Sequence, residues 1–294
     1  MKKPLSSAKV LVVGLARNCE DEIGREIQKI SSAFSEAKTV NFLIIESDSD
    51  DKTLIILENL SKNDNFEFIS LGNIRNQYPK RTERIAICRN RYLEELRTSK
   101  KYNDTDYVVV ADLDGVNSEI TATAVESCWK LDEDWDACFA NQCAPYYDIW
   151  ALRHDIWNPL DCFEQEAFFK TYKADDFFNR YTSILSKMIC IPKDAAPIRV
   201  KSAFGGLAIY KKNWLFKGEY LGVNNIGDEV CEHVHFHLSH MKDARLYIVP
   251  SLINCGWNEH SKHCNKIYML ILFCVTRLFS IDTIKKFKRY ISKK

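Results

Sequence analysis

Short apolar runs alternate with amphipathic segments over the first half of the chain. Four runs of aliphatic and aromatic residues are predicted as strands: 9–14, 40–45, 66–71 and 107–111. Three segments between them carry apolar residues at helical spacing and are predicted as helices: 20–37, 54–60 and 84–96. Strands that alternate with helices over short connections indicate an α/β fold with a Rossmann-like, mainly parallel sheet flanked by helices.

The pattern becomes irregular and rich in aromatic residues in the second half of the chain. A strand over 202–210, a helix over 229–241 and a strand over 245–249 are predicted there. The sequence shows no internal repeat, low-complexity tract or linker rich in proline and glycine. We therefore expect residues 1–264 to form a single domain, whose halves meet at about residue 140.

The composition limits which binding partners and which cellular compartment are expected for this protein. The chain has 294 residues and a formal net charge of +1, so no nucleic-acid partner is expected. Its eleven cysteines include no CxxC pair, which favours a reducing, cytoplasmic compartment over a disulfide framework. No stretch reaches the ~20 uninterrupted apolar residues of a membrane span.

Polar side chains gather where three of the predicted strands end. Arg17 and Asn18 follow the first strand, Glu46 and Asp48 the second, and Asp112 the fourth, with Asp114 two residues later. Ligands of parallel α/β sheets bind beyond the carboxyl ends of the strands. The chemistry of this protein is therefore expected at this edge of the sheet.

The Asp112-Leu113-Asp114-Gly115 segment is a candidate metal site. Two aspartates one residue apart point the same way if strand geometry continues beyond residue 111. Carboxylates suit Mn²⁺ or Mg²⁺, which take one or two of them together with substrate phosphates. The alternative is a polar turn that merely ends the strand.

Two further segments have the composition of a nucleotide site. The acidic turn that contains Glu46 and Asp48 can accept hydrogen bonds from a base or ribose; helix capping by Ser49 or Asp50 is the alternative, and both can hold. The segment 81–91 carries arginines suited to phosphate. A solvated face paired with nearby glutamates explains any single arginine almost as well.

Two segments of the second half stand out. Gly205 and Gly206 lie in or beside a strand, where either a close ligand or a β-bulge would require glycine. On a helix, three histidines would share one face, at 233, 237 and 240. That face suits zinc, but it is equally compatible with polar surface or a hydrogen-bonded interior. Glu232 beside it is a candidate base or acceptor-orienting carboxylate.

With these residues assembled, the chain resembles GT-A glycosyltransferases. It is similar in particular to the fungal capsule-associated α-1,3-mannosyltransferase family and its bacterial and viral relatives. Five elements carry the resemblance: Gly14 to Asn18, Arg89-Asn90-Arg91, Asp112-Leu113-Asp114, Tyr147 to Arg153, and Gly205-Gly206. The resemblance implies a GT-A type fold, with a donor-binding first half and an elaborated acceptor-side second half.

The resemblance also implies roles for individual residues. Asp48 would lie near the base, Asp112 near the ribose and metal, and Asp114 on the metal. The Tyr147 to Arg153 segment would line the donor or acceptor pocket and supplies Asp148 as a second candidate catalytic carboxylate beside Glu232. Residues implied to contact the donor or the metal are, in addition, Arg17, Asn18, Glu46, Arg84, Arg89, Asn90, Gly205, Gly206 and, as a metal ligand, His260.

The predicted function is metal-dependent transfer of a sugar from a GDP- or UDP-sugar to a glycan or lipid-linked acceptor, in surface polysaccharide or glycoconjugate synthesis. A nucleotidyltransferase and a non-catalytic nucleotide-sugar binding protein are the alternatives. Residues 265–294 mix apolar and basic residues and are predicted as an amphipathic helix. Such a helix either contacts the inner face of a membrane or docks on the domain.

Overall fold

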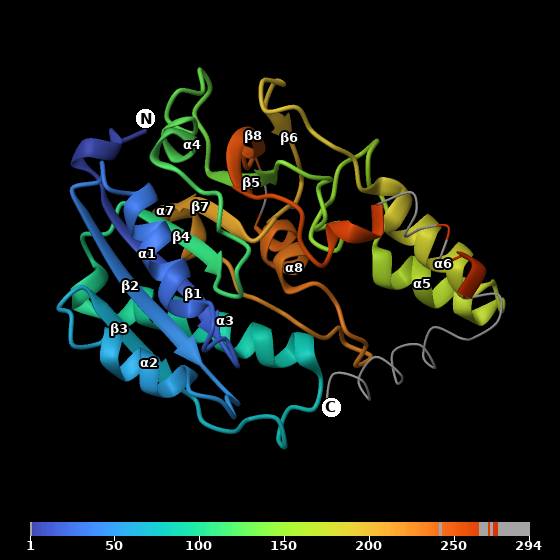
Figure 1. Ribbon diagram of the computed structural model, residues 1–294, viewed down its shortest axis with the longest axis horizontal. Helices are drawn as coiled ribbons and strands as arrows, with labels where there is room; N and C mark the ends of the chain where they lie inside the picture. Colours follow the sequence, from blue (N-terminus) through green and yellow to red (C-terminus); the bar gives the residue numbers. More distant parts are fainter. Residues whose placement is uncertain (1, 241–242, 265–269, 271–272, 276–294) are drawn as a thin grey trace.

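The computed structural model describes residues 2–240, 243–264, 270 and 273–275. One eight-stranded sheet forms its centre, in the order β3-β2-β1-β4-β7-β5-β8-β6 (Figure 1). The strands are β1 (Lys9–Ala16), β2 (Thr39–Glu46), β3 (Phe66–Ser70), β4 (Tyr107–Asp112), β5 (Ala137–Gln142), β6 (Ile198–Arg199), β7 (Leu207–Lys211) and β8 (Leu246–Cys255).

The sheet is mainly parallel. β3, β2, β1 and β4 run in one direction, and β5 and β8 are parallel to each other. β7 lies antiparallel between β4 and β5, and β6 is antiparallel to β8. The predicted α/β class, with a mainly parallel sheet flanked by helices, is confirmed.

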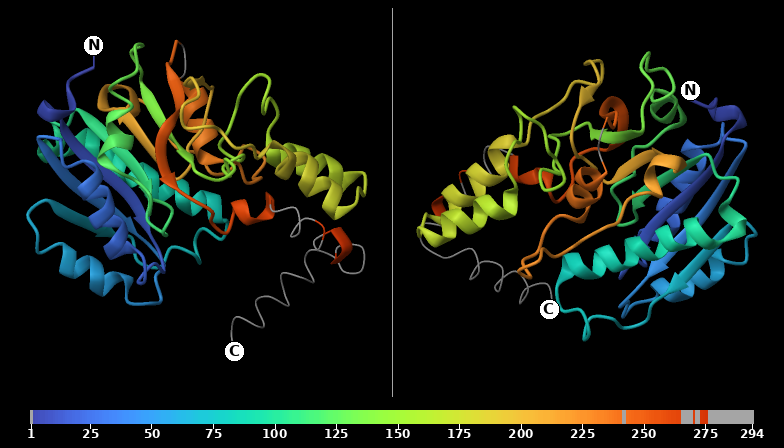
Figure 2. Two further views of the ribbon diagram at one scale, coloured as in Figure 1. Left: turned by 45° about the horizontal axis from the view of Figure 1, so that its top comes forward. Right: turned by 180° about the vertical axis from the view of Figure 1, so that it is seen from behind.

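Helices cover both faces of the sheet. They are α1 (Ile23–Ala33), α2 (Thr53–Leu60), α3 (Arg81–Thr98), α4 (Ala122–Glu126), α5 (Cys162–Thr171), α6 (Asp176–Ser183), α7 (Lys212–Leu215) and α8 (Glu232–Ser239). Apolar residues of α1, α2 and α4 pack into one buried cluster, and those of α3 and α8 into another on the opposite face. Helices α5 and α6 pack together and project away from the sheet (Figures 1 and 2).

The elements predicted for the first half agree with the structure to within a few residues. The helix predicted over 20–37 is shorter, and the one predicted over 84–96 is longer. In the second half, the strand predicted over 202–210 begins only at Leu207, because Gly205 and Gly206 both have positive φ angles and break the strand. The helix predicted over 229–241 begins at Glu232.

Two predictions concern membranes. In the part of the chain that the structure describes, no helix is long and apolar enough to cross a membrane. The helix predicted over 265–294 lies outside the described residues, apart from residues 270 and 273–275.

Candidate active site

One edge of the sheet collects loops from both halves of the chain. The carboxyl ends of β1, β2 and β4 lie in register there, since Leu15 pairs with both Ile45 and Asp112. β5 and β8 end at the same edge, and the antiparallel β7 begins there. Segments far apart in the sequence therefore surround a single space.

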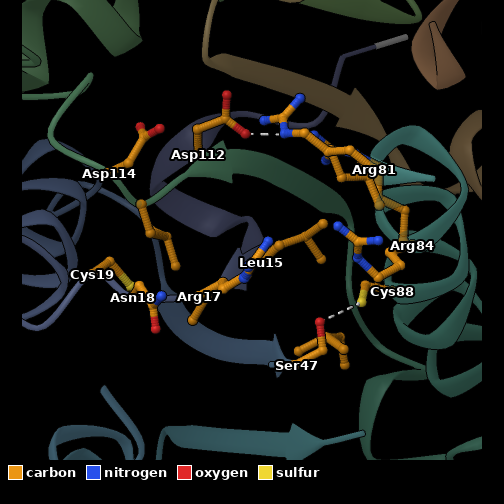
Figure 3. A pocket seen from close by; sticks show the side chains of 15 residues that line it. Leu15, Arg17, Asn18, Cys19, Ser47, Arg81, Arg84, Cys88, Asp112 and Asp114 are labelled. Carbon is orange, nitrogen blue, oxygen red and sulfur yellow. Dashed lines mark hydrogen bonds and ion pairs between the residues drawn. The ribbon is translucent and has the colours of Figure 1, made fainter. Parts of the chain in front are cut away.

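That space consists of two adjoining chambers. The first has a volume of about 340 Å³ and lies against the ends of β1, β2 and β4 and the start of α3 (Figure 3). The second has a volume of about 520 Å³ and is lined mainly by the second half of the chain. The residues that line both chambers are Arg81, Ile85, Arg89, Asp112 and Asp114.

The first chamber is rich in positive charge. Arg17, Arg81 and Arg84 line it together with Asp112 and Asp114 (Figure 3), and Arg89 lines it as well. Three of these arginines lie on α3, the first of them at its first residue, where the helix dipole adds partial positive charge. Guanidinium groups and a helix N-terminus are the groups that bind phosphate in proteins, so this chamber suits an anionic, phosphate-bearing ligand.

Asp112 ends β4 on the floor between the chambers. Its backbone N–H donates to the Gly206 carbonyl, and its side chain is 38% exposed. Desolvation, and then the neighbouring charge of Asp114, raise the pKa of Asp112 to about 8. A carboxylate whose pKa is raised by burial and by a neighbouring carboxylate belongs to a donor set that a divalent cation would neutralise.

Asp114 and His260 approach this floor from two sides. Desolvation raises the pKa of Asp114, while the charges of His260 and Arg81 act in the opposite direction. The His260 ring stacks on Tyr147 at 5.1 Å. No cluster of three or more histidine, cysteine or acidic side chains placed to hold a metal occurs among the described residues. The two aspartates thus fit a cation that completes its coordination with phosphate and water oxygens.

Arg89 joins the two chambers. Its Nη2 lies 3.4 Å from Asp112 Oδ1, and its Nε donates to Glu232 Oε1 at 3.1 Å. The side chain is 4% exposed, and its Nη1 is buried without a hydrogen-bond partner. Phe204 and Tyr220 present their rings to the guanidinium at 5.1 and 5.6 Å.

Arg84 is held at the far end of the first chamber. Its Nη1 donates to the carbonyls of Tyr78 and Pro79, and its Nε lies 3.8 Å from Asp48 Oδ2. Asp48 itself is buried with φ +58° and accepts a hydrogen bond from the Arg75 N–H. It therefore acts on the chamber through Arg84 and does not line it.

Glu46 and Asn90 are not brought to the chambers. Glu46 is fully buried and accepts from the Ser49 N–H and the Ser70 hydroxyl, so it shapes the turn after β2. Asn90 bonds in both directions with the backbone of Tyr220. Helix α2 follows this turn. At its start the Thr53 N–H donates to the Asp51 side chain, so Asp51 takes the capping role considered for Ser49 or Asp50.

Asn18 lines the first chamber and braces it. Its φ is +49°, and its side-chain oxygen accepts from the Asp50 N–H, which ties the end of β1 to the turn after β2. Asparagine tolerates this left-handed conformation better than most residues.

Gly205 and Gly206 serve protein packing. A Cβ atom on Gly205 would lie 2.8 Å from the Ala140 carbonyl oxygen, and one on Gly206 would lie 2.7 Å from the Tyr147 hydroxyl. Neither glycine lines a chamber, but the Gly205 N–H donates to Asp148 Oδ2 at 2.9 Å. Gly205 thus holds Asp148, and the Gly206 carbonyl, which accepts from the Asp112 N–H, holds the end of β4.

Asp148 and Glu232, the two candidate catalytic carboxylates, both line the second chamber. Burial raises the pKa of Asp148, and hydrogen bonds from the backbone of Gly205 and Ala151 lower it. Glu232 is 7% exposed and is paired with Arg89. Both carboxylates therefore line the same chamber as Asp112 and Asp114.

The histidines of α8 lie in the interior and do not converge on a metal site. His237 Nδ1 lies 2.8 Å from the Ser202 hydroxyl, and its Nε2 lies 2.8 Å from the Tyr210 hydroxyl. Both of its nitrogens are therefore used within the protein. His233 stacks on Phe204 at 4.0 Å; both of its ring nitrogens lack a hydrogen bond, and its Nε2 lies 3.8 Å from Glu232 Oε1. Of the alternatives that the sequence left open, a hydrogen-bonded interior describes His237.

Several residues of the site are not identified by the sequence. Arg81 faces both chambers, although only Arg84 and Arg89 were singled out in its helix. Phe204 and Glu229 line the second chamber. The aromatic richness of the second half was a signal for this lining, but periodicity could not select the rings that face the cleft.

Comparison with known proteins identifies no family. No protein-family model and no curated protein matches the chain. Among solved structures, TarS residues 1–349 from S. aureus, in complex with UDP-GlcNAc, is 14% identical with a TM-score of 0.45. That match covers 86% of this chain and 60% of the TarS fragment, so the chain spans less than two thirds of it.

Two other solved structures are similar to the same degree. The mannosyltransferase PcManGT from Pyrobaculum calidifontis, in complex with GDP-Man and Mn²⁺, is 14% identical with a TM-score of 0.42, over 86% of this chain and 60% of that one. Glucosyl-3-phosphoglycerate synthase from Mycobacterium tuberculosis is 13% identical with a TM-score of 0.41, over 85% and 67%. Because these TM-scores lie below 0.5, the three structures carry no part of the functional argument.

Proposed function

We propose that this chain is a metal-dependent glycosyltransferase of the GT-A type. One observation carries the proposal: an arginine-lined chamber and a chamber lined by carboxylates and aromatic rings meet at Asp112 and Asp114. A nucleotide sugar has the same division of chemistry, with an anionic diphosphate joined to an uncharged sugar. The diphosphate would occupy the first chamber, the transferred sugar would lie at the junction beside Asp112 and Asp114, and the second chamber would remain open to the acceptor.

Each charged residue at the junction then has a role. Asp112 and Asp114 would hold Mn²⁺ or Mg²⁺, which as a Lewis acid stabilises the charge that develops on the departing diphosphate. Arg81 and Arg84 from α3, and Arg17 directly after β1, would bind phosphate oxygens in the first chamber. Arg89 would orient Asp112 and Glu232, since it touches both.

The reaction exchanges one bond at the anomeric carbon for another. The bond to the diphosphate oxygen breaks and leaves its electron pair on that oxygen, a bond to an acceptor hydroxyl oxygen forms, and the hydroxyl proton is released. Asp148 and Glu232 lie in the chamber where this hydroxyl would enter, so either can accept a hydrogen bond from it. Retention and inversion of configuration are both compatible with this arrangement.

The finer parts of the proposal come from the sequence. A GDP- or UDP-sugar donor, a mannosyl group, and a glycan or lipid-linked acceptor of surface polysaccharide synthesis follow from the family resemblance. A cytoplasmic location, or one on the inner face of a membrane, goes with them. A nucleotidyltransferase is the weaker alternative, because Gly14 to Asn18 lacks a glycine-rich phosphate loop with a lysine.

Thermal stability with nucleotides tests the proposal. UDP, GDP, CMP and dTDP, and their sugars, are added with and without Mn²⁺. We expect at least one nucleotide to raise the melting temperature only when Mn²⁺ is present, and its sugar to be transferred or hydrolysed. If no nucleotide stabilises the protein in a metal-dependent way, the proposal fails; binding without turnover would indicate a binding protein.

The variant Asp114→Asn isolates the metal site. It keeps the size of the side chain and removes its charge, so we expect the metal-dependent stabilisation to disappear and turnover to fall by about 100-fold or more. Asp64→Asn, at an exposed position away from both chambers, is the matched control. Full Mn²⁺-dependent activity in Asp114→Asn would exclude Asp114 as a ligand.

A further inference from the structure

The two chambers differ in the sign of their charge. Four arginines and two aspartates line the first, whereas two arginines and five carboxylates line the second. One of those two arginines, Arg89, is already paired with Asp112 and Glu232. A phosphate or carboxylate that entered the second chamber would lie against Asp148 and Glu232, and like charges at short range in a partly desolvated site repel strongly.

The walls of the second chamber include flat, apolar surfaces. Phe204 and His233 stack at 4.0 Å with their planes 23° apart, and Tyr147 and His260 stack at 5.1 Å with their planes 24° apart. Trp150 is half-buried at the same lining. These pairs cover the rings of Phe204 and Tyr147, whereas Trp150, Phe163 and His260 keep exposed surface at the lining. The apolar, flat C–H face of a pyranose ring would pack against these three rings.

Polar atoms without partners point to a hydroxyl-bearing ligand. Both ring nitrogens of His233 are buried without a hydrogen bond, as is Arg89 Nη1. Buried polar atoms rarely lack a partner in folded proteins. Burial lowers the pKa of His233 well below its usual value, so the neutral ring offers one donor and one acceptor, which is the set that a hydroxyl group needs.

We propose that the second chamber binds an uncharged sugar unit of the acceptor, stacked on its aromatic walls and hydrogen-bonded through hydroxyl groups to Asp148, Glu232 and His233. This inference rests on the proposed function and specifies its acceptor class. An acceptor that carries a phosphate or carboxylate on the sugar unit that receives the transfer is excluded. The volume of about 520 Å³ is typical of a small-ligand site.

A glycan array tests the proposal. It carries neutral oligosaccharides together with phosphorylated, sialylated and uronic-acid glycans, and the full chain is applied with Mn²⁺ and the nucleotide that stabilises it. We expect binding to neutral glycans and none to glycans whose terminal sugar is charged. Binding to the charged glycans alone, or to no glycan, would overturn the proposal.

His233→Phe is the decisive variant. Phenylalanine keeps the stacked ring and removes two nitrogens that make no hydrogen bond within the protein, so stability should be retained. We expect neutral-glycan binding to weaken about 10-fold, the equivalent of one lost hydrogen bond of about 1.4 kcal/mol. His235→Phe, on the same helix but outside both chambers, is the matched control.

Trp150→Ala is a second test of the glycan site, because it removes a half-buried aromatic side chain from the chamber lining and leaves the polar side chains in place. Unchanged glycan binding in both Trp150→Ala and His233→Phe would place the glycan elsewhere and overturn the proposal. Metal-dependent nucleotide stabilisation is measured in parallel. If it persists while neutral glycans fail to bind, only this inference falls; if it is absent, the proposed function itself fails.

Discussion

At the scale of single residues, the most demanding position is Arg89. Its guanidinium is nearly fully buried between carboxylates from α8 and the end of β4. Burial acts to lower the pKa of Arg89, but its neighbours, Glu232 and Asp112 among them, hold that pKa well above its usual value. A buried charge of this kind is tolerated only because it is paired, and the pair fixes the separation of the two chambers.

His237 allows a prediction about pH. Burial, and then the charges of His240 and Arg89, lower the pKa of His237 to about 3. The unfolded chain, with a histidine pKa of about 6.5, takes up the proton first as pH falls, so stability is lost as pH falls below that value. Between pH 7 and pH 5 the loss attributable to His237 is about 2 kcal/mol.

The measurement is urea unfolding at pH 7 and pH 5. His237→Gln removes the titrating group and keeps a polar side chain beside Ser202 and Tyr210. We expect the difference in unfolding free energy between the two pH values to shrink by about 2 kcal/mol in this variant. An equal pH dependence in the variant and the unchanged protein would contradict the prediction.

At the scale of elements, the loop after β4 is held from behind by a buried polar network. Glu26 on α1 accepts from the Asn117 N–H at 3.2 Å and from its side-chain amide at 2.8 Å. The same amide donates to the Asp112 carbonyl at 2.7 Å, and Asn254 donates to the Asn117 side-chain oxygen. Helix α1 therefore positions the two aspartates without touching a chamber.

Glu26→Ala is expected to weaken metal-dependent nucleotide binding by about 10-fold and to lower stability by about 2 kcal/mol, because two donors of Asn117 lose their buried acceptor. Calorimetric titration with Mn²⁺ and nucleotide gives the first quantity, and urea unfolding the second. Gln28→Ala, exposed on the same helix, is the control. Reduced stability with unchanged affinity would show that the network supports the fold but does not position the loop.

The elements also show how far the sequence can predict this site. Periodicity located β1, β2 and β4, and the strand-end rule predicted the sheet edge at which Asp112 and Asp114 line the chambers. Glu46 also stands at a strand end, but its side chain turns inward to Ser70. Periodicity does not encode the direction of a side chain at such a position, so the sequence could not predict this. The pairing of Arg89 with Glu232 joins residues 143 positions apart, and no local pattern predicts such a contact.

At the scale of the whole molecule, one sheet passes through both halves of the chain. β4 of the first half pairs with β7 of the second, and β7 pairs in turn with β5. Outside the sheet, Thr82 of α3 donates to Glu229, and Arg89 pairs with Glu232. The second chamber is lined by residues from both halves, which these contacts hold together. The site is therefore complete only when both halves are folded.

This arrangement predicts one cooperative unfolding transition. Residues 1–264 were expected to form a single domain, and a site built from both halves couples them further. In scanning calorimetry we expect one peak that moves upward as a whole with Mn²⁺ and nucleotide; a free ligand concentration of 100 Kd adds about 2.7 kcal/mol to the unfolding free energy. Asp114→Asn should keep the single peak and lose the shift. Two peaks, of which the ligand moves one, would mean that the first half binds the nucleotide alone and that the shared chambers do not couple the halves.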